Sequence, residues 1–173
     1  MKTTKINVRK LVCAAMMSTM GYVLSTFVSF PHMAPFQSMM NVICAVMLGP
    51  WWAFASAFVT GSMRIMLNGC NIMALVGAII GAWLAGFLYQ MGHKVWLAYI
   101  GEIVGTGLFA AVFCVPLMKI FYTAQISAQA SLFFLIPDFT LAGIIGGTMG
   151  IVLVAILYQT KAMQRMKFIL EQA

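Results

Sequence analysis

Residues 36–67 read FQSMMNVICAVMLGPWWAFASAFVTGSMRIML, and this stretch decides how many helices the fold contains. It is almost continuously apolar, but it is too long for one ordinary membrane helix. Gly49 and Pro50 interrupt it, and such a pair ends one helix and can begin another, because proline lacks an N–H group and fits the first helical turn. The stretch therefore predicts two helices, 36–48 and 50–67. At 1.5 Å per residue the first would be about 20 Å long, against a hydrocarbon core of about 30 Å.

The composition of the whole chain requires a lipid environment. Of the 173 residues, 63% are hydrophobic and only 8% are charged, whereas a soluble domain has roughly a quarter charged. We expect an all-α integral membrane protein with a single transmembrane domain, residues 1–173. The expected spans are 11–30, 36–48, 50–67, 72–90, 95–121 and 138–158. The first is about 20 residues long, which exceeds a secretory signal core of roughly 7–15, so we expect it to be retained.

Basic residues lie at both ends of the chain, beside apolar segments, as the positive-inside rule describes. Five crossings would place these two basic groups on opposite sides of the membrane. Six crossings place both in the cytoplasm, together with His93 and Lys94. We therefore predict a six-helix bundle with cytoplasmic N- and C-termini, in the plasma membrane of a bacterium or archaeon, and attribute the net charge of +7 to topology rather than to nucleic-acid binding. The basic residues are Lys2, Lys5, Arg9 and Lys10 at the start and Lys161, Arg165 and Lys167 near the end.

The sequence lacks the motifs of common active sites and metal sites. It contains no GxSxG, HExxH or Walker motif, and its four cysteines form no CxxC pair and no metal-ligand spacing. We expect a protein that is not an enzyme and that holds neither a metal nor another cofactor.

The intramembrane polar residues carry the functional prediction, because such groups are costly in lipid and are usually functional. In the six-helix topology most of them converge on the extracellular half of the bundle, where aromatic residues could form the walls of a small-molecule pocket. Three alternatives remain: Arg64 could extend to the outer interface, Asp138 could cap a helix, and the two asparagines beside Gly69 could form a turn. We also expect Arg64 and Asp138 to approach one another across the third and sixth helices. The predicted ligand-binding residues are Gln37, Asn41, Arg64, Asn68, Asn71, Phe134 and Asp138.

Two further features are predicted to support conformational coupling and assembly. Glu102 lies about two turns inside the cytoplasmic end of the fifth helix, where it could brace the bundle, couple conformations or, less readily, relay a proton. Small residues recur every four positions on several helices and allow close helix packing, within the bundle or with a partner protein. The first helix, with Ala14 and Ser18, is the best candidate for docking a partner.

Several segments, in order along nearly the whole chain, resemble one family. They include residues 36–42, 45–51 (AVMLGPW), 57–61 (AFVTG) with Arg64, the glycine-rich 77–86, 101–107 (GEIVGTG) and 132–134 with Pro137. In these segments the chain is similar to the S components of energy-coupling factor (ECF) vitamin transporters, and most of all to the thiazole type, ThiW.

This resemblance implies a fold, a function and partners. It implies a six-helix S component that captures the thiamine precursor hydroxyethylthiazole outside the cell. Import would be driven by an ECF transmembrane coupling protein and two ABC-type ATPases, which agrees with the missing Walker motif. The alternatives are an S component for another vitamin or heterocycle, a secondary carrier or small exporter driven by protons through Glu102 or Asp138, and a non-transporting assembly protein.

Overall fold

The structure, a computed structural model, describes residues 8–27, 35–121, 132–160 and 165, and the elements in these ranges are all helices. Helices α5, η1 and α6 follow one another without a break, so the described residues form six helical rods. The elements are α1 (Val8–Phe27), α2 (Pro35–Leu48), α3 (Pro50–Asn68), α4 (Met73–Gly92), α5 (Val95–Glu102), the π-helix η1 (Ile103–Ala110), α6 (Ala111–Phe121) and α8 (Leu132–Gln159).

The predicted break between the second and third helices is confirmed. The backbone conformation of Gly49 separates the two helices. Gly49 has φ 86° and ψ 179°, a backbone conformation that a residue with a Cβ rarely adopts. Pro50 then opens α3, where its missing N–H group costs no helical hydrogen bond. Helix α4 packs closely on this corner: a Cβ added to Gly86 would lie 2.5 Å from the Pro50 Cα atom. The turn from α2 to α3 therefore depends on one glycine in the turn and another facing it.

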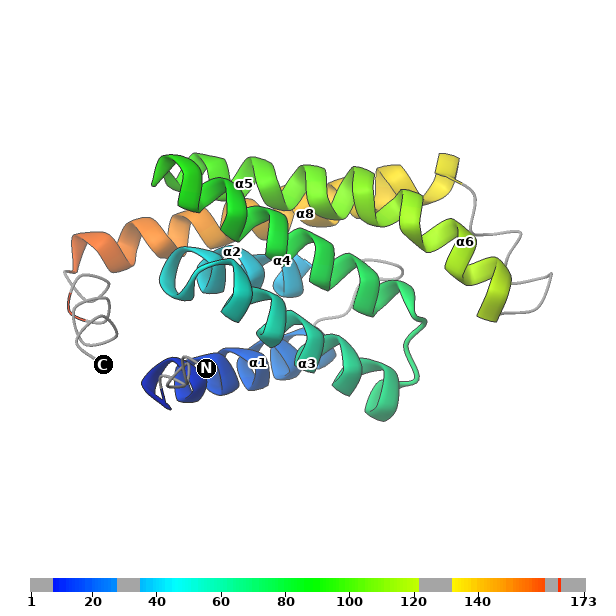
Figure 1. Cartoon of the computed structure of the whole chain (residues 1–173), viewed down its shortest axis with the longest axis horizontal. Coiled ribbons are helices and arrows are strands. Elements are labelled where there is room, and N and C mark those ends of the chain that lie inside the picture. Colours follow the sequence, from blue (N-terminus) through cyan, green and yellow to red (C-terminus); the bar gives the residue numbers. More distant parts are fainter. Residues whose placement is uncertain (1–7, 28–34, 122–131, 161–164, 166–173) are drawn as a thin grey trace, which may run out of the picture.

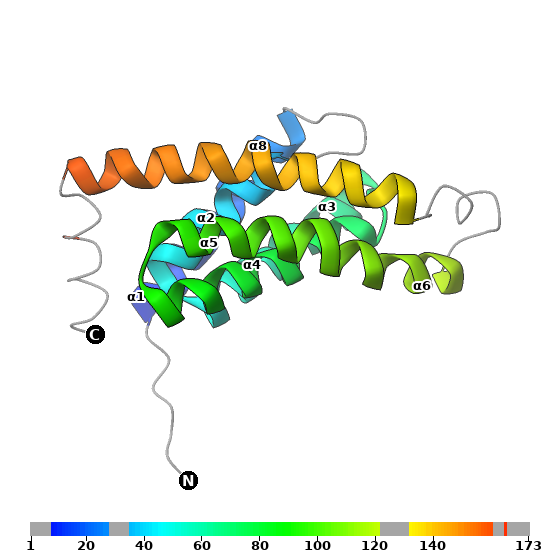
Figure 2. The ribbon, with the colours of Figure 1, turned by 90° about the horizontal axis from the view of Figure 1, so that it is seen from above.

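The rods form three layers of two (Figure 1). Helices α1 and α3 lie on one side, α2 and α4 in the middle, and the α5–η1–α6 rod with α8 on the other side; Figure 2 shows this last pair side by side. Helix α2 contacts α1, α3, α4, α5 and α8, and all of its residues except Phe36 are buried. This enclosure keeps the polar side chains of α2, Gln37, Ser38 and Asn41, away from lipid, where they would be costly. The start of α1 and the end of α8 lie at the same end of the bundle, as an even number of crossings requires (Figure 1).

The surface and length of the helices define a multi-pass membrane protein. In the described part of the chain, four helical segments are long and apolar enough to cross a bilayer: Val8–Phe27, Met73–Gly92, Val95–Phe121 and Leu135–Gln159. Helix α2 is apolar but has only 14 residues, so it is about 21 Å long and spans part of the hydrocarbon core. Large apolar side chains such as Phe27 and Met66 are more than four-fifths exposed, which suits contact with lipid tails.

The small-residue stripes of the fourth and sixth spans pack inside the bundle. Added Cβ atoms at Gly101 and Gly105 would lie 2.7 Å and 2.9 Å from the Cα atoms of Ala85 and Gly81, so the fifth rod lies directly against the backbone of α4. On α8, Gly146 and Gly150 face α2 in the same way. These stripes therefore act in helix packing, the first of the two functions weighed from the sequence.

The last helix begins earlier than predicted. Helix α8 starts at Leu132 rather than at Asp138, and it includes Pro137. Proline removes one helical hydrogen bond, but buried Leu135 and Phe139 on either side of it pack into a core cluster with α6 and hold both turns in place. Asp138 is therefore the seventh residue of the helix and not its N-cap.

Candidate functional site

Helix α2 carries three polar side chains into the middle of the bundle. Gln37, Ser38 and Asn41 are each at most 5% exposed, on a helix that is otherwise apolar. A polar group buried in this way is costly unless a partner bonds to it. The partners come from α3 on one side and from α5 and η1 on the other, which creates two polar groups at different depths.

The deeper group is centred on Glu102, whose side chain is fully buried. The Asn41 Nδ2 group donates hydrogen bonds to Glu102 Oε1 at 3.1 Å and to the Ala78 carbonyl at 3.2 Å. The Thr106 hydroxyl donates to the same Glu102 oxygen at 3.0 Å, whereas Oε2 has no hydrogen-bond partner among the described residues. We call Asn41, Glu102 and Thr106 the Glu102 network. It joins α2, α5 and η1.

The sequence analysis separated Glu102 from the other polar residues, and the structure brings it together with Asn41. Thr106 was not singled out, although its position four residues after Glu102 places it on the same helix face. The helix changes from α-helical to π-helical geometry directly after Glu102, because the π-helical segment begins at Ile103. Such segments are rare and often lie at functional sites.

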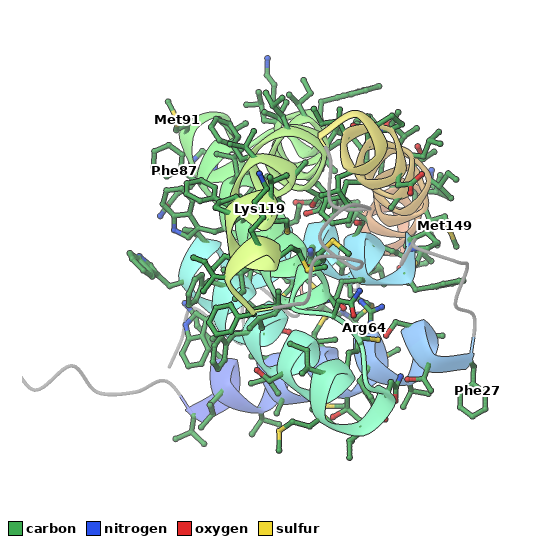
Figure 3. The ribbon with its side chains drawn as sticks, turned by 90° about the vertical axis from the view of Figure 1, so that its right-hand side faces the viewer. Phe27, Arg64, Phe87, Met91, Lys119 and Met149 are labelled. Carbon is green, nitrogen blue, oxygen red and sulfur yellow. The ribbon has the colours of Figure 1, made fainter. Side chains whose placement is uncertain are left out.

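The second group pairs Arg64 of α3 with Gln37. The Arg64 Nη1 group donates to Gln37 Oε1 at 3.5 Å, a long hydrogen bond, and the buried Nε group has no partner in the described part of the chain. The arginine is only 9% exposed. Figure 3 shows it inside the ring of helices, while Phe27, Phe87 and Met149 lie at the periphery. The alternative in which Arg64 extends to the outer interface is therefore wrong.

The start of α2 lies at the middle level of the bundle. Gly146, in the middle of α8, packs directly against Pro35, the first residue of α2. The N–H groups in the first turn of a helix have no acceptor within that helix, and this end carries a partial positive charge. We call the first turn of α2, with Gln37 and Arg64, the outer polar site.

Asp138 does not pair with Arg64 as expected. It is partly exposed and forms no hydrogen bond or ion pair with another residue that the structure describes. Asp138, Ala142 and Gly146 recur every four residues and share one face of α8. Because Gly146 packs on Pro35, Asp138 lies about 12 Å further toward the end of the bundle opposite Gln159, the end that the sequence predicts to be the outer one, and two turns beyond the start of α2.

Asn68 and Asn71 are exposed and do not join the outer polar site. Asn68 accepts a hydrogen bond from the Tyr22 hydroxyl at 3.0 Å and donates to the Thr26 hydroxyl at 2.8 Å, so it ties α3 to α1. The Asn71 carbonyl accepts the Ala74 N–H group at 2.9 Å, in the turn that begins α4. The side chain of Phe134, also predicted to bind ligand, lies outside the described residues.

The predicted docking stripe on α1 faces the interior, which corrects the sequence analysis. Ala14 and Ser18 are 5% and 3% exposed. The Ser18 hydroxyl lies 2.9 Å from the Ser56 hydroxyl and bonds to it, and Thr60 donates to the Ser18 carbonyl at 3.2 Å. Small residues mark a close helix contact, but they do not say which helix makes it. Here the contact is with α3, and Ser56 and Thr60 gave no separate signal in the sequence.

An apolar groove of about 430 Å³ runs along α3, α4 and the η1–α6 segment, apart from the polar groups. It contains none of the predicted site residues, and exposed aromatic side chains form much of its wall. Its lining is Trp51, Phe54, Ile79, Ile80, Trp83, Leu84, Phe109 and Phe113.

A multi-pass helical protein with polar side chains gathered at two depths in its core has the features of a membrane transport protein. The comparison with known families agrees. The family model of the thiamine-precursor transporter protein (ThiW) matches residues 11–160, and the chain belongs to this family. The resemblance seen in the sequence is thereby confirmed. No curated protein and no solved structure matches the chain.

Proposed function

We propose that this protein is the substrate-binding S component of an ECF transporter and that it captures hydroxyethylthiazole or a close heterocycle from outside the cell. The observation that carries this proposal is the outer polar site, a buried arginine and glutamine at the start of a short helix, in a chain of the thiamine-precursor transporter family. Asp138 and the outer aromatic residues, including Phe134, would contact the ligand from α8.

The proposed transport cycle relies on a partner for energy. The chain has no Walker motif, so ATP hydrolysis would come from two ABC-type ATPases acting through a transmembrane coupling protein. The chain would contribute binding and a docking surface, with no catalytic step of its own. The Glu102 network would hold α2 against the fifth rod while ligand is bound.

Ligand binding and transport can be tested separately. The purified protein should bind hydroxyethylthiazole without nucleotide, as measured by calorimetric titration. Proteoliposomes should take up the ligand only when they also contain the coupling module and ATP. Uptake by the chain alone, driven by a proton gradient, would instead favour a secondary carrier. Fully buried Glu102, one of whose oxygens has no hydrogen-bond partner among the described residues, is the residue that makes this carrier the second candidate.

Because Ala14 and Ser18 are buried, we propose the opposite, exposed face of α1 as the docking surface for the coupling protein. Ala15 and Thr19 have the same four-residue spacing as Ala14 and Ser18, but they are exposed. Thr19→Leu should leave ligand binding intact and reduce co-purification of the coupling protein. Ser18→Leu should instead destabilise the fold, because the side chain would enter the α1–α3 contact. Unchanged co-purification of the Thr19 variant would exclude this face as the docking surface.

A further inference from the structure

The positive charge of Arg64 has no counter-ion in the described bundle. The side chain that bonds to it in the described part of the chain, Gln37, is neutral, and the contact between Nη1 and Oε1 is long at 3.5 Å. The Nε group is buried and has no hydrogen-bond partner within the described ranges. Glu102 bonds to Asn41 and Thr106, and Asp138 forms no ion pair with the described residues. An unpaired buried charge is costly in a membrane protein and usually has a function.

A second source of positive potential lies at the same place. Gln37 belongs to the first turn of α2, a helix of 14 residues. The free N–H groups of a helix N-terminus attract anions, and the helix dipole adds to the attraction. The guanidinium group has several N–H donors in a planar fork that matches the oxygens of a phosphate or carboxylate. Both parts of the outer polar site therefore suit one kind of group, an oxyanion.

We propose that the outer polar site binds an anionic group on the ligand, so that the preferred precursor is a phosphate ester rather than the neutral alcohol. This inference rests on the proposed function and specifies the class of substrate. The ester oxygens would accept hydrogen bonds from Arg64 and from the first turn of α2, and Gln37 would keep the guanidinium group directed toward them. The heterocycle would extend from this anchor toward the outer end of the bundle.

The test compares two ligands on the same preparations. Dissociation constants for hydroxyethylthiazole and for its phosphate ester are measured by calorimetry, with the protein in phosphatidylcholine nanodiscs. The wild type should bind the ester at least tenfold more tightly than the alcohol. Arg64→Gln should remove this preference, so that the ester and the alcohol bind to the variant with dissociation constants within about threefold of one another.

Two further variants separate the charge effect from misfolding. Gln37→Glu keeps Arg64 and supplies it with an internal carboxylate, so it should also remove the preference for the ester while the protein stays folded. Lys119→Gln is the matched control. It removes one cation from the same end of the bundle, but Lys119 is exposed on α6, away from Arg64, so the preference should remain (Figure 3).

The possible results decide between distinct conclusions. If the alcohol binds as tightly as the ester, or if Arg64→Gln and Gln37→Glu both keep the preference, the anion site is wrong and the proposed function stands. If neither compound binds, the proposed function fails and this inference fails with it. If phosphatidylglycerol stabilises the wild type but not Arg64→Gln, and the ester gains no preference, a lipid phosphate occupies the site and the substrate assignment is overturned.

Discussion

Replacing Gly81 by alanine should destabilise the protein, whereas the same change at Gly77, one turn away on α4, should stabilise it. At Gly81 an added Cβ atom would meet the Thr106 hydroxyl and lie 2.8 Å and 3.0 Å from the two carboxylate oxygens of Glu102. At Gly77 the nearest atom would be a ring carbon of Phe139, at 3.8 Å, an ordinary van der Waals distance. The two variants differ in whether the methyl group disturbs the Glu102 network.

The size of the difference follows from three contributions. Both variants gain about 0.8–1 kcal/mol because alanine is a better helix former than glycine. Gly81→Ala additionally crowds a packed interior, at about 1–3 kcal/mol, and displaces the hydrogen bonds to Glu102, about 0.6 kcal/mol each in a membrane protein. The expected net change is roughly 1–3 kcal/mol of destabilisation for Gly81→Ala and up to about 1 kcal/mol of stabilisation for Gly77→Ala. The two variants should then differ by roughly 1–4 kcal/mol, which corresponds to melting temperatures roughly 2–16 °C apart.

The buried cysteines provide the assay. Cys44 and Cys114 are free and buried, so a thiol-reactive fluorogenic dye reports their exposure as detergent-solubilised protein unfolds. The partly exposed Cys13 and Cys70 are replaced by serine in every variant to lower the background. Equal melting temperatures for the two glycine variants, or a more stable Gly81 variant, would refute the contact between α4 and the Glu102 network.

Two more predictions use the same structure. Asn41→Ala should lower stability by about 1–3 kcal/mol, because the Glu102 carboxylate and the Ala78 carbonyl each lose a buried donor. Exposed Asn71→Ala should change it by no more than about 0.5 kcal/mol in the same melting assay, because Asn71 bonds to Ala74 through its backbone carbonyl. Similar losses in both variants would contradict the deeper polar group. In intact cells a membrane-impermeant maleimide should label a variant whose only cysteine is Cys70 and not one whose only cysteine is Cys13. The reason is that the proposed topology places the α3–α4 turn outside and the start of α1 at the cytoplasmic face. The opposite labelling pattern would reverse the topology.

The helices were largely predictable from the sequence because their boundaries depend on local chemistry. Gly49 and Pro50 end one helix and start the next through properties of their own backbones, and the structure has the boundary where it was expected. Pro137 shows the limit of such reasoning: proline often begins a helix, but here the packing of Leu135 and Phe139 extends α8 in front of it. The π-helical segment was not predicted either, since apolar residues continue through it without a change in composition.

The candidate site was less predictable because its contacts join distant parts of the chain. The sequence identified Gln37, Asn41, Arg64 and Glu102 as intramembrane polar residues, but the bond between Asn41 and Glu102 depends on how α2 packs against the fifth rod. The stripe of Ala14 and Ser18 was recognised, yet its partner proved to be α3. Spacing along a helix defines a face, and only the packed bundle defines what that face touches.

The shortness of α2 changes the distance over which a ligand must be moved. A helix of about 21 Å spans roughly 9 Å less than a hydrocarbon layer about 30 Å thick, and its first turn lies at the middle level of the bundle. In the proposed function, a ligand bound at that turn would therefore already lie within the hydrocarbon layer before transport begins. The residues of α2 after its first turn and the three residues of the Glu102 network are all buried. In the proposed function, passage of a ligand to the far side would require whole helices to shift relative to one another, because rotation of a single side chain does not open so many buried layers.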